Sequence, residues 1–285
     1  MAQSKTTITY NQVTGNYLIK YPSSDSTFFY TTIFEPATKI EPFIDACVYF
    51  DLDSGLYKYE YTVKNGVNSQ QRLLSFLVSF FSPIHNITKP NNQWSALPYS
   101  FVPVFSWSNT LISSYGGATP YDGIAPDSST SGFSFESSGL PTIMKSYSRG
   151  ATPTLHFIEE PPGEVYLLLK PLRKFPANTV QRKTLGPKDP PEDFVATTFI
   201  DTLISYKHQA LELGWITNQG VDNSLDKKLE NAKKQLEKGK TKTALNHLNA
   251  FLNEVEAQKD KHLSSEAYAL LKFNAEYLIK RLEEE

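Results

Sequence analysis

The chain has few of the residues that active-site chemistry requires. It carries one cysteine, Cys47, in 285 residues, which excludes an intrachain disulfide and a cluster of thiolate metal ligands. Cys47 lies in a run of strand-forming residues, so we expect a small buried side chain. No apolar run reaches the roughly 18–20 residues of a membrane-spanning helix. The formal net charge is -2, and the composition therefore predicts neither membrane insertion nor nucleic acid as a partner.

Two catalytic or metal-binding motifs are incomplete. The segment 132–136 resembles a serine nucleophile elbow, but Glu136 replaces its second glycine. Asp51 and Asp53 alternate before Gly55, as at the start of a calcium loop, but the glycine comes one place early. We expect a polar turn there. The sequence thus predicts a protein that is not an enzyme and has no cofactor or metal.

The sequence changes character at a proline-rich segment, residues 186–193. Of 37 aromatic residues, 29 lie before Pro191, and the rest of the chain is rich in Lys, Glu, Leu and Ala. Proline lacks a backbone N–H and fixes φ, so neither a helix interior nor a central strand fits here. We expect a β domain over 1–185, a stiff linker over 186–193 and a helical domain over 194–285.

Short strand-like segments fill the first part. Residues 56–63 alternate between apolar and polar side chains, and Asn65-Gly66 then favours a tight turn, so we expect a hairpin of 56–63 with 71–81. We expect long loops over 108–138, and further strands at 6–10, 16–21, 27–33, 43–50, 101–107, 142–147, 154–158 and 164–170. Without helical patterns between them, these strands predict an antiparallel β-sandwich of the immunoglobulin or fibronectin type.

Aromatic side chains in or near the expected loops indicate a ligand-binding surface. They would form a platform that stacks on sugar rings or on an apolar partner; the residues are Trp94, Tyr99, Trp107, Tyr115 and Tyr121. The alternative is that these rings cover the edges of the sandwich and fill the loop cores.

The second part has helical periodicity. Four amphipathic segments follow one another, with Gly214 and Gly239 placed to end helices. Asp222-Asn223-Ser224 and Ser264 offer side chains that would cap helix N-termini. Short connections between four such helices predict a four-helix antiparallel bundle.

Several of these helical residues resemble a known family. The segments Gly214–Val221 (GWITNQGV) and Ala250–Gln258 (AFLNEVEAQ), followed by Leu263-Ser264 and Ala267, are similar to the FIMAH-like helical domain. The resemblance covers roughly residues 194–282. Such domains typically follow β-rich or enzymatic modules in secreted or surface proteins of bacteria. The resemblance implies an exported multidomain protein with a helical accessory module, and it implies no catalytic residue.

These observations favour a non-catalytic interaction or structural protein. We expect an extracellular or cell-surface location, although the first residues lack the apolar core of a signal peptide, and we expect a protein or a cell-surface glycan as partner. One alternative is a carbohydrate-binding module that uses the loop aromatics, and another is a surface or filament subunit that assembles through an exposed sheet edge. A third is an enzyme with a glycosidase-type carboxylate pair, drawn from Asp45, Asp51, Glu136, Glu159 and Glu160.

Overall fold

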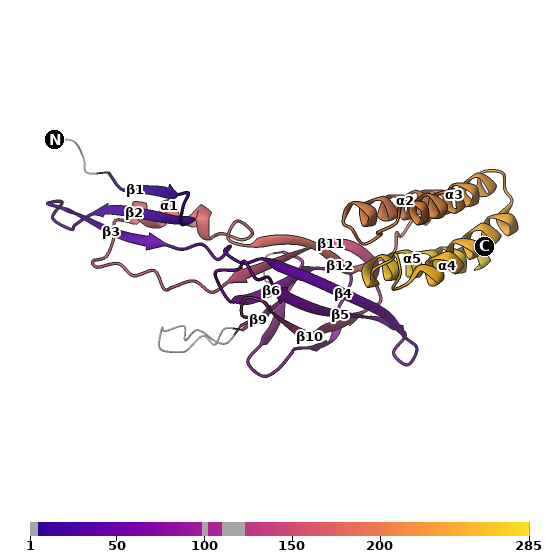
Figure 1. Cartoon of the computed structure of the whole chain (residues 1–285), viewed down its shortest axis with the longest axis horizontal. Helices are drawn as coiled ribbons and strands as arrows, with labels where there is room; N and C mark the ends of the chain where they lie inside the picture. The colour runs from indigo at the N-terminus through magenta and orange to yellow at the C-terminus, as the bar shows by residue number, and fades with distance from the viewer. Residues whose placement is uncertain (1–4, 99–101, 110–122, 285) are drawn as a thin grey trace.

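The computed structural model describes residues 5–98, 102–109 and 123–284. Three groups of elements succeed one another along an elongated molecule (Figure 1). A three-stranded sheet with one helix lies at one end, two larger sheets form the middle, and four helices form the other end. Within the described residues, no helix is long and apolar enough to cross a membrane.

The middle of the molecule is the predicted antiparallel β-sandwich. One sheet has the order β4 (Pro42–Asp51), β5 (Leu56–Asn65), β10 (Ser128–Ser137), β7 (His85–Thr88). The other has the order β12 (Val180–Lys188), β11 (Leu140–Gly150), β6 (Leu73–Ser79), β9 (Val104–Ser108), β8 (Ser95–Pro98). All neighbouring strands in both sheets pair antiparallel.

Aromatic rings from both sheets fill the space between them. The alternation in β5 buries Tyr59 and Tyr61 and turns their polar neighbours outward. Tyr61 contacts Phe76 of the facing sheet with ring centroids 5.5 Å apart, and Phe76 stacks on Trp107. Both tyrosine hydroxyls have a partner in the core, because Tyr59 donates to the Gly139 carbonyl at 2.8 Å and Tyr61 donates to the Leu185 carbonyl at 2.9 Å. The core therefore uses the aromatic surplus that the sequence shows.

Several expected elements of the first part are wrong. β5 and β6 do not form a hairpin, because β5 pairs with β4 and β10 while β6 pairs with β9 and β11. After β5 the chain crosses to the other sheet, and the Asn65 amide is held by the carbonyls of Gln71 and Ile124. The region expected as loops contains β10, which buries Phe133 and Phe135. Residues 154–158 form no strand.

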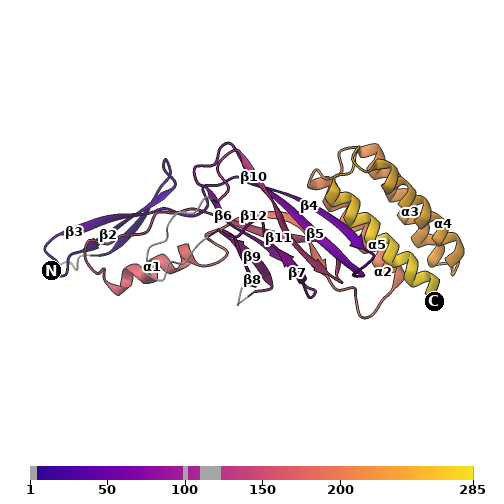
Figure 2. The ribbon, with the colours of Figure 1, turned by 90° about the horizontal axis from the view of Figure 1, so that it is seen from below.

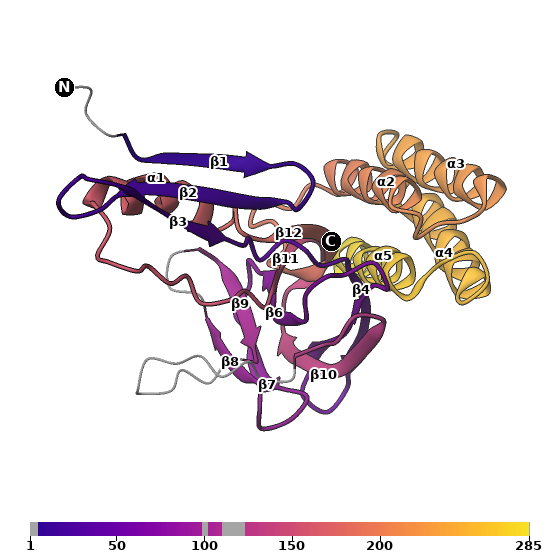
Figure 3. The same cartoon turned by 60° about the vertical axis from the view of Figure 1, so that its left-hand side comes forward.

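The N-terminal sheet is a separate layer that the sequence did not reveal. β1 (Thr7–Asn11), β2 (Asn16–Pro22) and β3 (Phe29–Phe34) pair in this order, and α1 (Gly163–Arg173) covers one face (Figure 3). We call β1–β3 and α1 the N-terminal unit. Its own small core comprises Ile19, Tyr21, Phe34, Val165 and Leu169. The expected strand at 164–170 is wrong, because Val165 and Leu169 lie four residues apart on one helical face.

The predicted four-helix bundle is confirmed. It comprises α2 (Ala196–Glu212), α3 (Gln219–Leu236), α4 (Thr241–Gln258) and α5 (Ser265–Glu284), with α2 also packed on α5. Gly214 and Gly239 follow α2 and α3 with φ of 74° and 68°, as left-handed caps require. Ser264 Oγ accepts from the Ala267 N–H at 3.3 Å.

One expected cap is wrong. α3 is capped by Asn218, whose Oδ1 accepts from the Gly220 and Val221 N–H groups at 2.8 and 3.1 Å. Asp222-Asn223-Ser224 therefore lies within the helix. Asp222 is buried there and pairs with a lysine of α2, which the cap pattern did not indicate.

The bundle packs directly on the sandwich. α5 lies along β4 and also contacts β11 and β12 (Figure 2). Phe273 meets Tyr57 with ring centroids 5.1 Å apart, and Asn274 donates to the Pro141 carbonyl at 2.9 Å. Buried residues of both parts form one continuous apolar cluster. The bundle is thus docked on the sandwich by α5.

The expected linker begins later than residue 186. Residues 186–188 are the end of β12, in which Pro187 pairs with Pro141 of β11. β12 is the outermost strand of its sheet, and on its outer side the Phe81 N–H donates to the Pro187 carbonyl at 2.8 Å, so this contact does not need the N–H that proline lacks. The connection between the two parts is therefore shorter than the proline content predicts.

Candidate functional site

The structure places two of the five predicted ligand-binding aromatics in the sandwich core. Trp94 is 3% exposed and Trp107 is fully buried. Both rings pack against Phe133, with centroids 4.9 and 5.8 Å away, and Trp107 Nε1 donates to the Thr88 carbonyl at 2.8 Å. Neither indole offers a free face to a ligand, so both fit the core-filling alternative. The other three, Tyr99, Tyr115 and Tyr121, lie outside the described residues, and the platform stays a prediction for them.

The other motifs of the sequence are parts of the sandwich. Residues 51–55 form a tight turn between β4 and β5, in which Asp51 Oδ1 accepts from the Asp53 N–H at 2.9 Å. Hydrogen bonds, first of all from the Asp53 N–H, lower the pKa of Asp51. Ser134 of the elbow-like segment is buried, and its Oγ lies 2.7 Å from Thr88 Oγ1. Among the described residues, no three His, Cys, Asp or Glu side chains converge as a metal site would need.

The carboxylates considered for a glycosidase pair are spread over several parts of the molecule. Asp45 and Asp51 lie on β4, with Asp51 at its end, and Glu136 lies on β10. Glu159 contacts the N-terminal unit, where it accepts from the Tyr30 hydroxyl at 2.6 Å. That hydrogen bond lowers the pKa of Glu159, which favours a permanent carboxylate over a general acid.

Two adjoining hollows meet where the sandwich contacts the bundle. The first, of about 310 Å³, lies over the outer face of the sheet that contains β4 and β5. The second, of about 420 Å³, lies between β4 and α5. They share Cys47 and Ser265, so we treat them as one feature and call it the junction groove. No sequence motif indicates this groove.

The sandwich side of the groove comes from the alternation of β4 and β5. Ala46 and Val48 are buried, and this turns Asp45, Cys47 and Tyr49 to the outer face. On β5, Lys58 pairs with Glu60 at 2.9 Å and lies over the Tyr49 ring, 5.6 Å from its centroid. Hydrogen bonds to Tyr49 and Glu60 raise the pKa of Lys58. These contacts hold the long side chains against the sheet.

The helical side is one face of α5. Tyr268, Lys272 and Glu276 follow one another at steps of four residues. The Tyr268 hydroxyl donates to Glu256 Oε2 at 2.9 Å, and Lys272 Nζ lies 2.5 Å from Glu256 Oε1. The Lys259 ammonium lies over the Tyr268 ring, 4.6 Å from its centroid. Burial raises the pKa of Glu276.

Cys47 is exposed in this groove, so the expected burial of its side chain is wrong. The protein atoms around the sulfur nevertheless raise the pKa of the thiol, chiefly by desolvation. A thiol with a raised pKa is protonated at neutral pH, and the thiolate is the nucleophilic form. Cys47 therefore suits a groove wall better than a catalytic centre.

The lining of the groove defines which ligands it suits. Three lysines, Lys58, Lys259 and Lys272, balance three carboxylates, Asp45, Glu60 and Glu276. Hydroxyl groups add donors and acceptors, and Tyr49, Phe50 and Tyr268 add aromatic surface. Such a lining suits an extended ligand that is close to neutral and carries both donors and acceptors.

Comparison with known proteins identifies the helical part. Residues 201–280 match the family model of the FIMAH domain, so the C-terminal third is FIMAH-like, as the sequence motifs predict. No curated protein matches the chain. An uncharacterized protein from Nocardia farcinica, whose crystal structure reveals an immunoglobulin-like fold, aligns over 52% of this chain and 98% of its own length. The identity is 11% and the TM-score 0.29. The fold thus defines a β-sandwich protein with a docked FIMAH-type bundle.

Proposed function

We propose that this chain is a non-catalytic interaction protein, exported by a bacterium, that holds an extended segment of a partner protein in the junction groove. The observation that carries the proposal is the composite lining, because the sheet of β4, β5, β10 and β7 supplies one wall, and α5 with Lys259 at the end of α4 supplies the other. The FIMAH match supports an exported protein. On this proposal, the helical domain is part of the binding site as well as an accessory module.

The chemistry of the lining favours a polypeptide. A main chain is neutral and alternates N–H and C=O groups, which matches a groove whose charges cancel and whose hydroxyls both donate and accept. The groove also runs beside β4, the outermost strand of its sheet. The backbone N–H of Ala46 on this strand already donates a hydrogen bond to Glu266 Oε1 of α5, at 2.6 Å. β4 therefore offers its outward side chains, and not a free strand edge, to an extended segment.

Two parallel screens test the proposal. The full chain is panned against a phage-displayed random peptide library and applied to a glycan array. We expect enriched peptides whose Kd rises about tenfold or more in Tyr268→Ala, because an aromatic wall is lost. Tyr166→Ala is the matched control, since Tyr166 is an exposed tyrosine of α1, 43% accessible and outside the groove. Its peptide affinity stays unchanged.

Three outcomes of these screens would contradict the proposal. Binding to glycans without binding to peptides would support the carbohydrate-binding alternative. Peptide affinities that survive Tyr268→Ala and Lys259→Ala would place the binding surface elsewhere. If the chain binds neither peptides nor glycans in these screens, the proposal of an interaction protein is wrong.

Self-assembly is a second candidate, and a specific observation favours it. The N-terminal unit and the segment that leads to α1 expose several large apolar side chains, including Val13, Ile33, Ile158 and Leu167, at 95%, 57%, 73% and 71%. Exposed apolar side chains often mark interaction surfaces, and here they lie on both outer sides of the unit, with Ile33 on β3 and Leu167 on α1. Light scattering coupled to gel filtration tests this: oligomers that dissociate in Ile33→Lys and Leu167→Lys would support it, and a monomer at high concentration would contradict it.

A further inference from the structure

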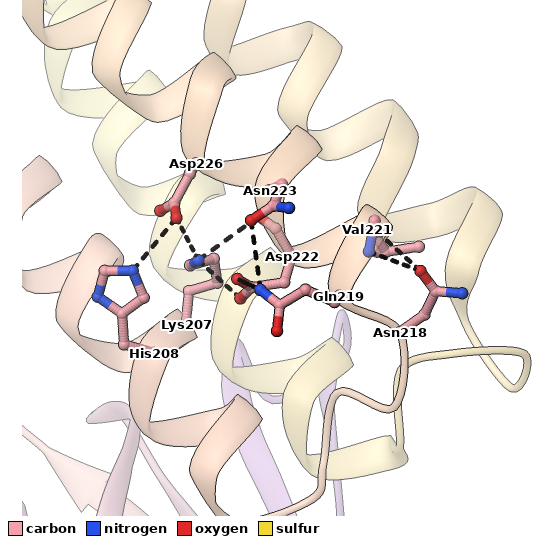
Figure 4. A network of polar contacts seen from close by, with 9 residues as sticks. Lys207, His208, Asn218, Gln219, Val221, Asp222, Asn223 and Asp226 are labelled. Atoms are coloured by element: carbon pink, nitrogen blue, oxygen red, sulfur yellow. Dashed lines mark hydrogen bonds and ion pairs between the residues drawn. The ribbon is translucent and has the colours of Figure 1, made fainter.

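A lysine is completely buried between two helices of the bundle. Lys207 of α2 has a side-chain exposure of 0%, and its Nζ lies 2.6 Å from Asp222 Oδ1 and 2.6 Å from Asp226 Oδ2, both on α3 (Figure 4). Asp222 is also buried, whereas 23% of the Asp226 side chain is exposed. Apolar residues lie one turn away on each side of Lys207, since Leu203 and Ala210 are fully buried. An ammonium group at such a position is costly to desolvate, and apolar residues commonly replace buried ion pairs without loss.

The two carboxylates contact the lysine in different ways. Asp226 Oδ2 accepts a hydrogen bond from Lys207 Nζ. Asp222 Oδ1 is equally close to Nζ, yet it has no hydrogen-bond partner among the described residues. The other oxygen, Asp222 Oδ2, accepts from Gln219 Nε2 at 3.0 Å. The Lys207 nitrogen therefore lies directly against the Asp222 carboxyl group, in ionic contact with Oδ1 but without an aligned hydrogen bond to it, and this proximity is the first requirement for a reaction between the two groups.

We propose that Lys207 and Asp222 condense to form an amide cross-link between α2 and α3, with Asp226 as the group that carries the protons. Asp226 first takes a proton from the Lys207 ammonium and passes it to Asp222, so that a neutral amine faces a neutral carboxyl group. The Nζ lone pair then attacks Cγ of Asp222, and a C–N bond forms. One C–O bond of the Asp222 carboxyl breaks, and its oxygen leaves as water. The two protons of that water come from Lys207 through Asp226, which ends unchanged, and no oxidant or co-reactant is needed.

The surroundings suit this condensation in two respects. The reacting groups are held together inside one folded domain, and well-oriented intramolecular reactions reach effective molarities of about 10⁵–10⁸ M. Lys207 and Asp222 are buried, so bulk water does not reach the amide once the released water has left past the partly exposed Asp226. Asp226 is connected to the outside, because His208 Nε2 lies 3.2 Å from Asp226 Oδ2 and is 53% exposed. The proton carrier can therefore exchange protons with solvent.

The bond would link α2 and α3, the first two helices of the bundle, covalently. It joins positions on either side of the turn at Gly214, where the chain otherwise holds α2 against α3 only by packing and ion pairs. A covalent tie limits the unfolded states of this segment and resists separation of the two helices under load. This inference is independent of the proposed function, since neither residue lines the junction groove.

The mass of the intact protein tests the proposal. The full chain is folded, then denatured and weighed by electrospray mass spectrometry. We expect a mass lower by one water molecule than the sequence requires, and trypsin that no longer cuts after Lys207. Lys207→Arg keeps the positive charge but cannot condense in this way, and Asp222→Ala removes the electrophile, so both variants recover the full sequence mass.

A matched control exists between the same two helices. Lys233 of α3 pairs with Asp201 of α2 at 2.7 Å, but both side chains are partly exposed. Lys233→Arg therefore keeps the deficit of one water. Asp226→Asn tests the proton carrier, and we expect it to retain the full sequence mass although both reacting groups are present.

Several results would overturn these assignments. A wild-type protein of full sequence mass after prolonged incubation in the folded state would exclude the cross-link, whatever the variants do. A deficit that persists in Lys207→Arg would place the modification elsewhere. A deficit that persists in Asp226→Asn would remove the role assigned to Asp226 and leave the bond. Because the decisive reading is made on the wild type, a variant that fails to fold does not affect it.

Discussion

The two ends of the molecule are joined to the sandwich in different ways. The helical bundle shares one continuous apolar cluster with the sandwich, through contacts such as Phe273 on Tyr57. The N-terminal unit has a core of its own, centred on Ile19 and Tyr21. A shared core couples the unfolding of two parts, whereas a separate core lets one part open alone. The bundle and the sandwich should therefore behave as one cooperative unit, with the N-terminal unit as a second.

The largest effect is expected at the shared core. Phe273 is 5% exposed, and Phe273→Ala leaves a cavity beside Tyr57, so we expect a loss of about 3–5 kcal/mol in the free energy of unfolding. Urea unfolding measures the loss, and hydrogen–deuterium exchange shows where it falls. Protection should decrease together in β5 and α4. If only the helices lose protection, the two parts are not coupled. Leu52→Ala, at an 88% exposed position, serves as the control.

A smaller and local effect is expected in the N-terminal unit. Ile19 is fully buried, and Ile19→Ala should cost about 2–4 kcal/mol in the stability of that unit. Hydrogen–deuterium exchange should show faster exchange in β1–β3 and α1, with α4 unchanged. If Ile19→Ala also lowers hydrogen-exchange protection in the bundle, the N-terminal unit does not unfold independently of the rest of the molecule.

The next prediction concerns a single hydrogen bond between β4 and α5. Glu266→Ala leaves the buried Ala46 N–H without its 2.6 Å acceptor, which should cost about 1–3 kcal/mol. Glu266→Gln keeps an acceptor and should recover most of that stability in thermal unfolding. Equal losses in both variants would mean that the negative charge, and not the hydrogen bond, stabilises the contact.

The smallest expected effect is a loss of folding stability at alkaline pH, caused by Tyr57 at the contact between the sandwich and the bundle. Burial raises the pKa of Tyr57 from 10.0 to about 12. The folded state therefore favours the neutral phenol, and its contribution to stability is complete below pH 10 and is lost as the pH rises through about 12. Tyr57→Phe should lose less stability than the wild type between pH 9 and 12 in urea titrations. Identical pH profiles would show that Tyr57 is not buried at the junction.

The sequence predicts the bundle better than the sandwich because helical signals are local. Gly214, Gly239 and Ser264 act within a turn of their own positions, and each ends or caps a helix as expected. The start of α3 is the exception. There Asp222 takes part in a buried contact with Lys207, and no local pattern reveals a partner 15 residues away.

The pairing of strands depends on distant residues, and this explains the errors in the first part. β5 pairs with β10, whose serine-rich sequence resembles a loop until Phe133 and Phe135 are seen to face the core. The junction groove is harder still to foresee. Its two walls come from β4 and α5, which the chain separates by more than two hundred residues, so no motif of either wall indicates the other.

The docking of α5 on β4 also has a consequence for biosynthesis. The ribosome synthesises β4 early and α5 late. The outer edge of β4 is therefore uncovered while the chain from Lys188 to Ser265 is translated, which takes roughly 4–15 s. An uncovered outer strand is a template for pairing with other chains. During that interval β4 is exposed to pairing with other chains, and the docking of α5 ends this exposure.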